Sequence, residues 1–232
     1  MSKAKKMNLN PNPAGIQMPA PSLAERIPPL SSRGHASGHI IVGRGEKRRT
    51  VLVESGLEFK WAIVLDADPD VKSIREQVKM EWSDEGEKRV HYFDFLATMR
   101  SGQKAALIVK PAKRARSKKF LREAREIAAQ VARTGFADET RVLTDECVDP
   151  VHLRNARLFR SVCEPDVHAD EVAVSLIKNL VGAVSISELT ARLELGARGF
   201  RATVRLISIG CLEPLHHEVI SPATLVKKGG VL

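Results

Sequence analysis

Three side chains able to handle a metal ion and a phosphate occur at Glu58, Asp94 and Lys110. Glu58 lies in a stretch with helical periodicity, where Trp61 and Leu65 follow at i+3 and i+7, so its carboxylate shares the apolar face that packs inward. Asp94 and Lys110 each interrupt an apolar run of the kind found in strands. The sequence therefore places two acids and a lysine where burial is expected.

Alternation along the two predicted strands shows which neighbours share a face with each charge. A period of two puts Tyr92, Asp94 and Leu96 on one face of the first strand, and Ile108 and Lys110 on one face of the second. Buried charges cost free energy unless they are paired or hold an ion. Cleavage of a phosphodiester would explain why two acids and a lysine are buried together. In that reaction carboxylates hold Mg²⁺, the ion polarises the phosphate, and a lysine stabilises the charge that develops.

The order of these groups, a helix acid followed by a strand aspartate and a strand lysine, resembles the PD-(D/E)XK restriction-endonuclease-like nucleases. The short sequence motifs resemble more closely those of TnsA, the endonuclease subunit of heteromeric cut-and-paste transposases. These motifs are L-E in the first helix, D-P-D-V followed by I-R-E-Q, then D-F-L and V-K-P-A. The resemblance is strong over about residues 52–112 and weaker from there to the C-terminus. It implies an α/β protein with a restriction-endonuclease-like αβββαβ core, followed by a mostly helical, winged-helix-like domain.

The same resemblance implies a metal-dependent endodeoxyribonuclease that hydrolyses the 5′ strand at transposon ends. It assigns catalysis to Glu58, Asp94 and Lys110, and a supporting role to Gln77 of the I-R-E-Q motif. Glu58 and Asp94 would hold Mg²⁺, for which Mn²⁺ can substitute.

One position departs from the family pattern. Ile108 stands two residues before the lysine, where related enzymes carry Asp, Glu or Gln, and its side chain cannot bind a metal. Glu58 would then replace the missing acid, with the backbone carbonyl of Val109 as a further ligand, and the number of metal ions stays open. Glu58 also has a structural alternative, because Ser55-x-x-Glu58 spells a capping box in which the glutamate closes the helix start. Glu54, one turn earlier, is the fallback acid.

The expected partners follow from the resemblance. Double-stranded DNA at transposon ends is the substrate, an integrase-like (TnsB-like) transposase subunit cuts and joins the other strand, and an ATPase regulator (TnsC-like) docks through the C-terminal domain. Two alternatives remain open. One is a DNA-binding or adaptor subunit whose nuclease core has lost its chemistry, which Ile108 favours. The other is a stand-alone restriction or repair nuclease of the same fold, which would need no partner.

The composition is compatible with such a protein. The chain has 232 residues, 43% of them hydrophobic, and a net charge of +9, an excess that favours polyanionic partners. Cys147, Cys163 and Cys211 stand far apart without a C-x-x-C pair, so neither a disulfide framework nor a zinc knuckle is indicated. No apolar run reaches membrane-spanning length, and the first residues lack the apolar core of a signal peptide. We expect no membrane association and a cytoplasmic, nucleoid-associated location.

Three regions are predicted. Residues 1–38 are rich in Pro, Ser, Asn and Gly and form an arm, disordered or ordered by a partner, with three lysines near its tip. Residues 39–149 hold the nuclease domain, which begins with a hairpin or basic loop, and residues 150–232 hold the C-terminal domain. The candidate DNA-contacting side chains are basic residues on either side of the predicted site: Arg48, Arg49, Lys113, Arg114, Arg116, Lys118 and Lys119.

The C-terminal region has the pattern of a helix-turn-helix with a wing. A capping box over 185–188, a turn at Gly196 and a helix over 197–209 predict the two helices, and two short apolar strands over 211–226 would form the wing. Three arginines on the second helix do not decide between DNA reading and protein docking: Arg198, Arg201 and Arg205.

Overall fold

The computed structural model describes residues 18–27, 37–84 and 86–230, so the lysines near the tip of the predicted arm lie outside the described residues. In chain order, the elements are β1 (Gly38–Val42), a 3₁₀ turn η1 (Gly45–Lys47), β2 (Arg49–Val53), α1 (Gly56–Ala67), β3 (Val71–Asp84), β4 (Glu87–Met99), β5 (Lys104–Val109), α2 (Ala112–Ala115), α3 (Lys118–Thr134), β6 (Glu139–Leu143), α4 (Pro150–Ser161), α5 (Val167–Lys178), β7 (Ala183–Ser185), α6 (Ile186–Leu193), α7 (Ala197–Ser208), β8 (Leu212–Pro214) and β9 (Leu225–Lys228).

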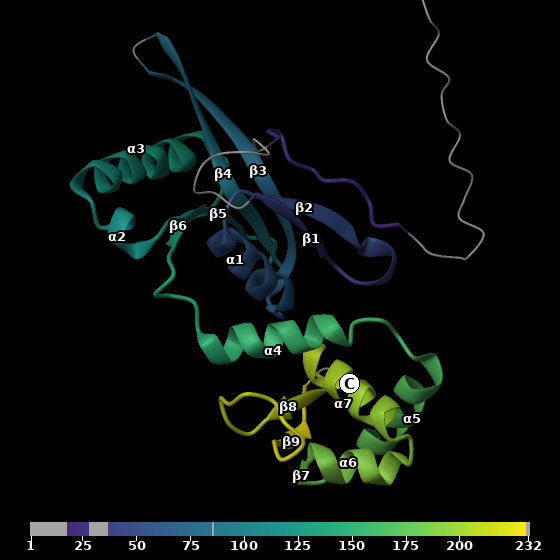
Figure 1. The fold of residues 1–232 in the computed structure, drawn as a ribbon. Helices are drawn as coiled ribbons and strands as arrows, with labels where there is room; N and C mark the ends of the chain where they lie inside the picture. Colours follow the sequence, from purple (N-terminus) through teal and green to yellow (C-terminus); the bar gives the residue numbers. More distant parts are fainter. Residues whose placement is uncertain (1–17, 28–36, 85, 231–232) are drawn as a thin grey trace, which may run out of the picture.

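The main feature of the first half is a mixed sheet with the strand order β3-β4-β5-β6. β3, β4 and β5 are antiparallel neighbours, whereas β6 is parallel to β5. A parallel pair needs a crossover connection, which α2 and α3 supply (Figure 1). β1 and β2 form a separate antiparallel hairpin before α1, one of the two forms predicted for that stretch. The chain is an α/β protein, as predicted.

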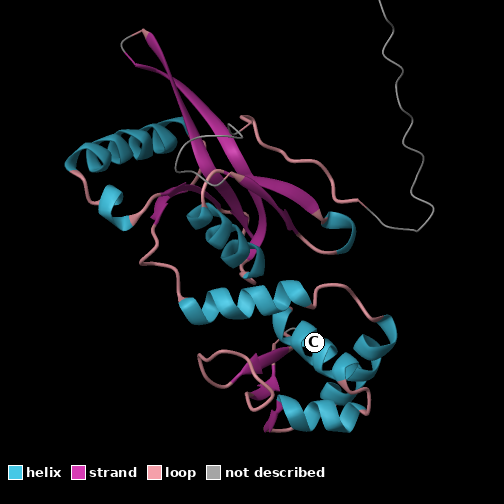
Figure 2. Cartoon of the chain, in the orientation of Figure 1, coloured by secondary structure: helices cyan, strands magenta, loops and turns pink. Residues whose placement is uncertain are grey.

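Apolar side chains pack on both faces of this sheet. One set, which we call the α1-side cluster, joins the sheet to α1 and includes Trp61, Phe95 and Val109. The other, which we call the α3-side cluster, joins the sheet to α3 and includes Phe93 and Ile127. Helices are therefore available to shield both faces (Figure 2), and a charged side chain on a central strand loses much of its contact with water.

Local sequence signals set the ends of the helices. Ser55 caps α1 by accepting a hydrogen bond from the Glu58 N–H at 3.1 Å. Ser117 caps α3 in the same way, through the Phe120 N–H at 3.3 Å. Gly135 ends α3 with a φ of 63°, a left-handed conformation that favours glycine, as its position after the apolar stripe predicts.

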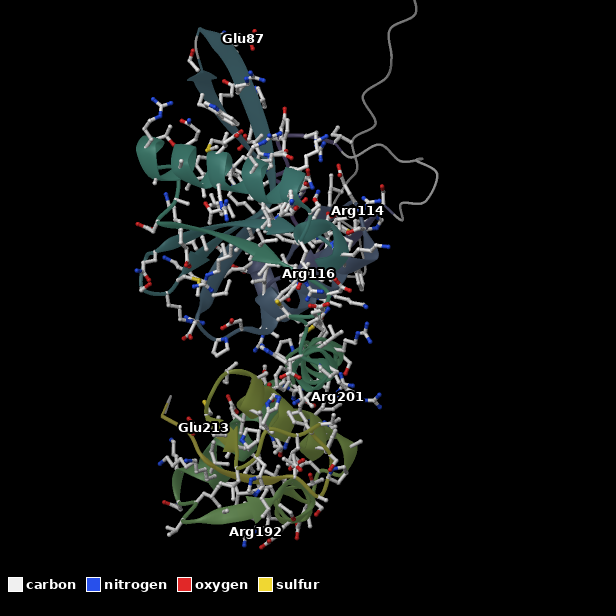
Figure 3. The ribbon with its side chains drawn as sticks, turned by 90° about the vertical axis from the view of Figure 1, so that its left-hand side faces the viewer. Glu87, Arg114, Arg116, Arg192, Arg201 and Glu213 are labelled. Atoms are coloured by element: carbon white, nitrogen blue, oxygen red, sulfur yellow. The ribbon has the colours of Figure 1, made fainter. Side chains whose placement is uncertain are left out.

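β3 and β4 form a longer hairpin than the sequence pattern indicates. Periodicity predicts strands over 71–82 and 90–96 with a polar loop between them. The two strands instead pair as far as Asp84 and Glu87, near the projecting tip where Figure 3 labels Glu87. A two-stranded ribbon is solvated on both faces, so polar residues can occupy it without the apolar alternation that marks a buried strand.

Residues 18–27, which we call the N-terminal strap, run beside β2 and reach β3 (purple in Figure 1). The Ala20 N–H donates to the Arg48 carbonyl at 2.8 Å, and the Ala20 carbonyl accepts from the Thr50 N–H at 2.8 Å. The Glu25 N–H then donates to the Gln77 carbonyl at 3.2 Å. This differs from the arm without a fold predicted for residues 1–38. The strap takes its conformation from backbone hydrogen bonds to the sheet. Because any residue can make such bonds, they require no apolar periodicity, and the sequence gives no sign of them.

The second half is mostly helical, as predicted. Helices α5, α6 and α7 and a small sheet in the order β7-β9-β8 enclose an apolar set that includes Ile177, Leu189 and Val204, which we call the C-terminal cluster. α6 begins at the predicted capping box, where Ser185 accepts from the Glu188 N–H at 3.1 Å. No helix in the described ranges has the length and apolar character needed to cross a membrane.

α4 lies between the two halves and contributes to both cores (Figure 1). Leu153 and Ala156 belong to the α1-side cluster, whereas Leu158 and Phe159 pack against the C-terminal cluster. The boundary predicted between residues 149 and 150 falls at Asp149, the N-cap of this helix.

Candidate active site

Glu58, Asp94 and Lys110 come together from α1, from β4 and from the residue that follows β5. Burial has the largest influence on the pKa of Glu58 and of Asp94, and it raises both. The Glu58 charge raises the pKa of Asp94 further, while Lys110 acts on both acids in the opposite direction. Charges influence one another in this way only when they lie close together. The structure therefore brings the three predicted catalytic residues into one site.

At Asp94, the side chains of β4 stop following a regular alternation between the two faces of the sheet. Phe93 packs in the α3-side cluster, whereas Phe95 packs in the α1-side cluster, although residues two apart in a regular strand face the same side. Leu96 is again in the α3-side cluster. The uninterrupted alternation predicted for this strand is therefore wrong at Asp94, because the backbone turns over there. In the pairing of β4 with β3, Phe95 lies opposite Glu76 and Phe93 lies opposite Val78, and Asp94 falls between these two pairs.

The carboxylate of Asp94 is held against the neighbouring strand. Its Oδ2 accepts a hydrogen bond from the Val109 N–H at 2.6 Å. Burial, followed by the nearby Glu58 charge, raises the pKa of Asp94 to about 7, and the Val109 bond offsets only part of that increase. Without a cation, burial therefore favours the protonated form of this side chain far more than in an exposed aspartate.

Glu58 occupies the capping-box position that the sequence offered as its structural alternative. Its Oε2 accepts from the Glu54 N–H at 2.7 Å, and its Oε1 accepts from the Ser55 hydroxyl at 2.8 Å. These bonds lower the pKa of the Glu58 carboxyl but do not overcome the effect of its burial, which raises it. A carboxylate oxygen has a second lone pair, so the cap leaves Glu58 able to bind a cation as well.

The two residues before Lys110 have different surroundings. Ile108 is 3% exposed and packs in the α3-side cluster, which explains why an apolar side chain suits this position. Val109 contacts the site through its N–H, which binds Asp94. Lys110 is half-buried, and its own N–H donates to the Leu143 carbonyl of β6 at 2.9 Å, so the backbone that carries the lysine is fixed to the sheet. The role of the Val109 carbonyl as a ligand stays a prediction.

Gln77, the predicted supporting residue, lies in β3 in a strained conformation. Its φ is 50°, a region that non-glycine residues seldom occupy and that costs about 1–3 kcal/mol. The side chain is fully buried, and its Nε2 has no hydrogen-bond partner among the described residues. Strain and an unsatisfied buried donor at one residue are features that cluster at functional sites.

The donor set of the site fits a hard divalent cation. Two carboxylates whose ionisation is opposed by burial would be relieved by a positive ion, and Mg²⁺ usually takes one or two protein carboxylates together with water and substrate phosphate. In the described part of the chain, no three His, Cys, Asp or Glu side chains gather closely enough to hold a metal on their own. The protein would thus provide two acidic ligands, Glu58 and Asp94.

The predicted DNA-contacting residues fall into two groups. Arg49 is engaged in the fold, since its Nη1 donates at 2.7 Å to the fully buried Glu76, and Arg48 pairs with Glu164 of the second half. The remaining five are exposed on α2, on the start of α3 or between them: Lys113, Arg114, Arg116, Lys118 and Lys119. Arg116 forms an ion pair with Glu146. Figure 3 shows Arg114 and Arg116 on the first half, well apart from Arg192 and Arg201 on the second.

Sequence reasoning did not single out two further residues of this region, Arg26 and His91. Burial lowers the pKa of His91 to about 4, and the charges of Lys110 and Arg26 act in the same direction, so the imidazole is neutral at pH 7. His91 could have been noticed as a polar residue three positions before Asp94. Arg26 could not, because the strap that carries it shows no periodicity and no motif.

Neither a protein-family model nor a curated protein matches this chain. The assignment of a function therefore depends on the residues and geometry of the site.

Proposed function

We propose that the chain is a metal-dependent DNA endonuclease subunit of a heteromeric cut-and-paste transposase, which hydrolyses the 5′ strand at transposon ends. The observation that carries the proposal is the convergence of Glu58 from α1, Asp94 from β4 and Lys110 from just after the end of β5. Acids whose burial opposes their ionisation reduce the stability of the fold, so their presence together is better explained by function than by folding.

The three residues have distinct roles in hydrolysis. Glu58 and Asp94 supply the negative charge that attracts and orients a divalent cation. Lys110 donates to the scissile phosphate and offsets the charge that develops on its oxygens. Mg²⁺, or Mn²⁺ in its place, supplies Lewis acidity and lowers the pKa of a water when it is bound at these carboxylates.

The order and pairing of the elements support a more specific fold assignment. Helix α1, the antiparallel strands β3 to β5, the α2–α3 crossover and the parallel strand β6 follow the order expected of a restriction-endonuclease-like core. In the second half, α6 and α7 with the antiparallel strands β8 and β9 support a winged-helix-like domain.

The arginines of α7 favour protein docking over DNA reading for the second half. Arg198 donates to both carboxylate oxygens of Asp166, at 2.7 and 2.8 Å, and Arg205 is 8% exposed and donates to Asp170 at 2.7 Å. These side chains cannot reach base edges without breaking those pairs. For this half, the resemblance implies an ATPase regulator of the TnsC-like class as the partner. A TnsB-like transposase would cut the other strand, within a cytoplasmic, nucleoid-associated complex.

A second candidate is an adaptor subunit whose nuclease core is inactive. Two observations favour it: Ile108 supplies no ligand, and both oxygens of Glu58 are already bonded at the start of α1. In that case the charged site would be a remnant that only binds DNA or a cation.

Strand-specific cleavage by the assembled complex tests the proposal. The chain is combined in Mg²⁺ with the transposase and ATPase encoded beside it, on DNA whose 5′ strand is labelled near a transposon end. Lys110→Ala and Asp94→Asn are each expected to lower the rate of 5′-strand cleavage by about 100-fold or more. Lys104→Ala, at the exposed opposite end of β5, is the matched control and is expected to keep the full rate.

Each other outcome has a definite meaning. Full cleavage by Lys110→Ala would exclude this site as the nuclease. Assembly on DNA without 5′-strand cleavage by the wild-type chain would favour the adaptor. Equal cleavage by the chain without its neighbours would favour a stand-alone nuclease.

A further inference from the structure

The N-terminal strap is fixed to the sheet on both sides of Arg26. Before it, the Ser22 hydroxyl donates to the fully buried Glu76 at 2.6 Å. Next to it, the carboxylate of Glu25 accepts from Arg75 of β3 at 2.7 Å, in addition to the backbone bond that Glu25 makes with β3. The backbone at position 26 is therefore held at the same part of β3 that carries Gln77.

The guanidinium of Arg26 is held in place by three side chains. Its Nε and Nη2 donate to Gln77 Oε1 at 3.2 and 2.7 Å, and Nη2 also donates to Glu54 Oε1 at 2.6 Å. The guanidinium carbon lies 5.1 Å from the centroid of the Tyr92 ring, within the range of a cation–π contact. An arginine with so few free torsions has already lost most of the side-chain entropy that binding a ligand would cost.

The donors that remain are those that an oxyanion would need. Arg26 Nη1 has no hydrogen-bond partner among the described residues, and the Arg26 side chain is 40% exposed, so an outside ligand can approach it. Gln77 uses its oxygen for Arg26, which leaves only the Nε2 donor of that amide, and this donor is unpartnered in the described structure. Unpaired donors of this kind indicate an oxygen-bearing ligand.

Arg26 lies on the Lys110 side of the site. After burial, the charges of Lys110 and then Arg26 are the influences that lower the pKa of His91. Two cations that act on one buried imidazole must both lie near it. Glu54, which pairs with Arg26, is also bonded to the first acid of the site, since its backbone N–H donates to Glu58 Oε2 at 2.7 Å.

We propose that Arg26 is a phosphate-contacting residue of the active site, delivered by the N-terminal strap and held ready by Gln77 and Glu54. The ligand is a DNA backbone phosphate, and this identity rests on the proposed nuclease function. Arginine suits the task because its planar donors match two phosphate oxygens at once. The strap then completes the site instead of only covering the sheet.

Salt dependence of DNA binding separates this role from one in which Arg26 only fastens the strap. The full-length chain is titrated with duplex DNA in Ca²⁺, an oxygen-binding cation used here to slow hydrolysis, over a series of salt concentrations. Each phosphate contact contributes about 0.9 to the slope of log K against log salt. Arg26→Ala is expected to reduce that slope by about 0.9, and to slow 5′-strand cleavage by the complex about 10- to 100-fold.

Two variants serve as controls. Arg26→Lys keeps a cation and is expected to retain most of the slope, although its cleavage rate falls because an ammonium cannot bind Gln77 at two points. Arg100→Ala removes an exposed arginine at the β4–β5 turn, where it contacts the Pro69 carbonyl, and is expected to change neither slope nor rate. Thermal melting of each variant reports whether the strap has loosened.

The outcomes distinguish the two proposals. A lower melting temperature for Arg26→Ala with an unchanged slope and rate would reduce Arg26 to a structural fastener, while loss of cleavage in Lys110→Ala would still support the nuclease. A reduced slope in a complex that never cleaves would keep Arg26 as a phosphate contact and remove the nuclease. A wild-type chain that contacts no duplex DNA, either alone or within the assembled complex, would overturn both.

Discussion

The charged residues around Asp94 and those along α7 follow opposite rules. On α7, Arg198 and Arg205 each meet a carboxylate at the start of α5 at hydrogen-bond distance, and the charges compensate one another. Around Asp94, burial opposes ionisation, Gln77 has a strained backbone and its amide donor finds no acceptor in the described structure. Paired charges of the first kind stabilise a fold, whereas uncompensated ones reduce stability and are kept for another purpose. The difference separates charges that hold the fold together from charges whose burial the fold does not compensate.

Removing the Arg205 side chain should give the largest change in stability and would test the structural side of this contrast. Arg205→Ala leaves Asp170 without its main partner in a half-buried place and removes a hydrogen bond to the Val162 carbonyl. We expect a loss of about 3 kcal/mol in the free energy of unfolding, measured by urea denaturation with circular dichroism. Arg201→Ala on the same helix, whose guanidinium is exposed, is the control. Equal effects of the two variants would mean that burial of the pair contributes nothing.

Asp94→Asn should have an effect of the opposite sign, which makes it the sharpest test of the functional side. The folded-state pKa of Asp94, about 7, lies above the ordinary value, so the wild-type chain loses stability as pH rises from about 4 to 7, and the loss is complete above that range. An amide does not ionise. The variant is therefore expected to melt about 2–6 °C higher than wild type at pH 8 in the absence of divalent cations, with a smaller gain at pH 5.

Differential scanning calorimetry at the two pH values measures this difference. Asp138→Asn, at an exposed carboxylate beside Lys104 at the start of β5, is the matched control, because a solvated charge costs the fold little. A variant that melts lower than wild type at pH 8 would show that the charge on Asp94 stabilises the fold after all.

Arg198→Ala should give the smallest change. Its ion pair with Asp166 is more than half exposed on the arginine side, so we expect a loss below about 1 kcal/mol that diminishes at high salt. Asp166→Ala should cost more, by about 1 kcal/mol, because Asp166 also caps α5 by accepting from the Ala169 N–H. Thermal melts at low and high salt, followed by circular dichroism, measure both. A larger loss for Arg198→Ala than for Asp166→Ala would contradict the assignment of the cap.

The parts of the fold that could be predicted are those that local chemistry specifies. The capping serines, Gly135 at the end of α3 and the apolar stripes are each visible within a few residues of sequence, and the helices follow from them. The convergence of Glu58, Asp94 and Lys110 could be anticipated because the order of elements and charges resembles a known family. The change of face at Asp94 could not, since a period of two carries no sign of where a strand turns over.

The contribution of the strap was hidden for a different reason. Its bonds to Thr50 and Gln77 are made by the backbone, which every residue possesses, and the side chain that it directs to the site, Arg26, is a basic residue in a Pro-rich segment. Only proximity in space distinguishes Arg26 from the other arginines of the chain. A site residue supplied by a segment without periodicity therefore requires the three-dimensional arrangement before it can be recognised.

The sharing of α4 between two cores has a practical consequence for dissecting this protein. A recombinant fragment that stops at residue 149 would strip Leu153 and Ala156 from the side of α1, and one that starts at residue 150 would carry both side chains bare to water. Neither truncation is expected to behave as a clean, independent piece.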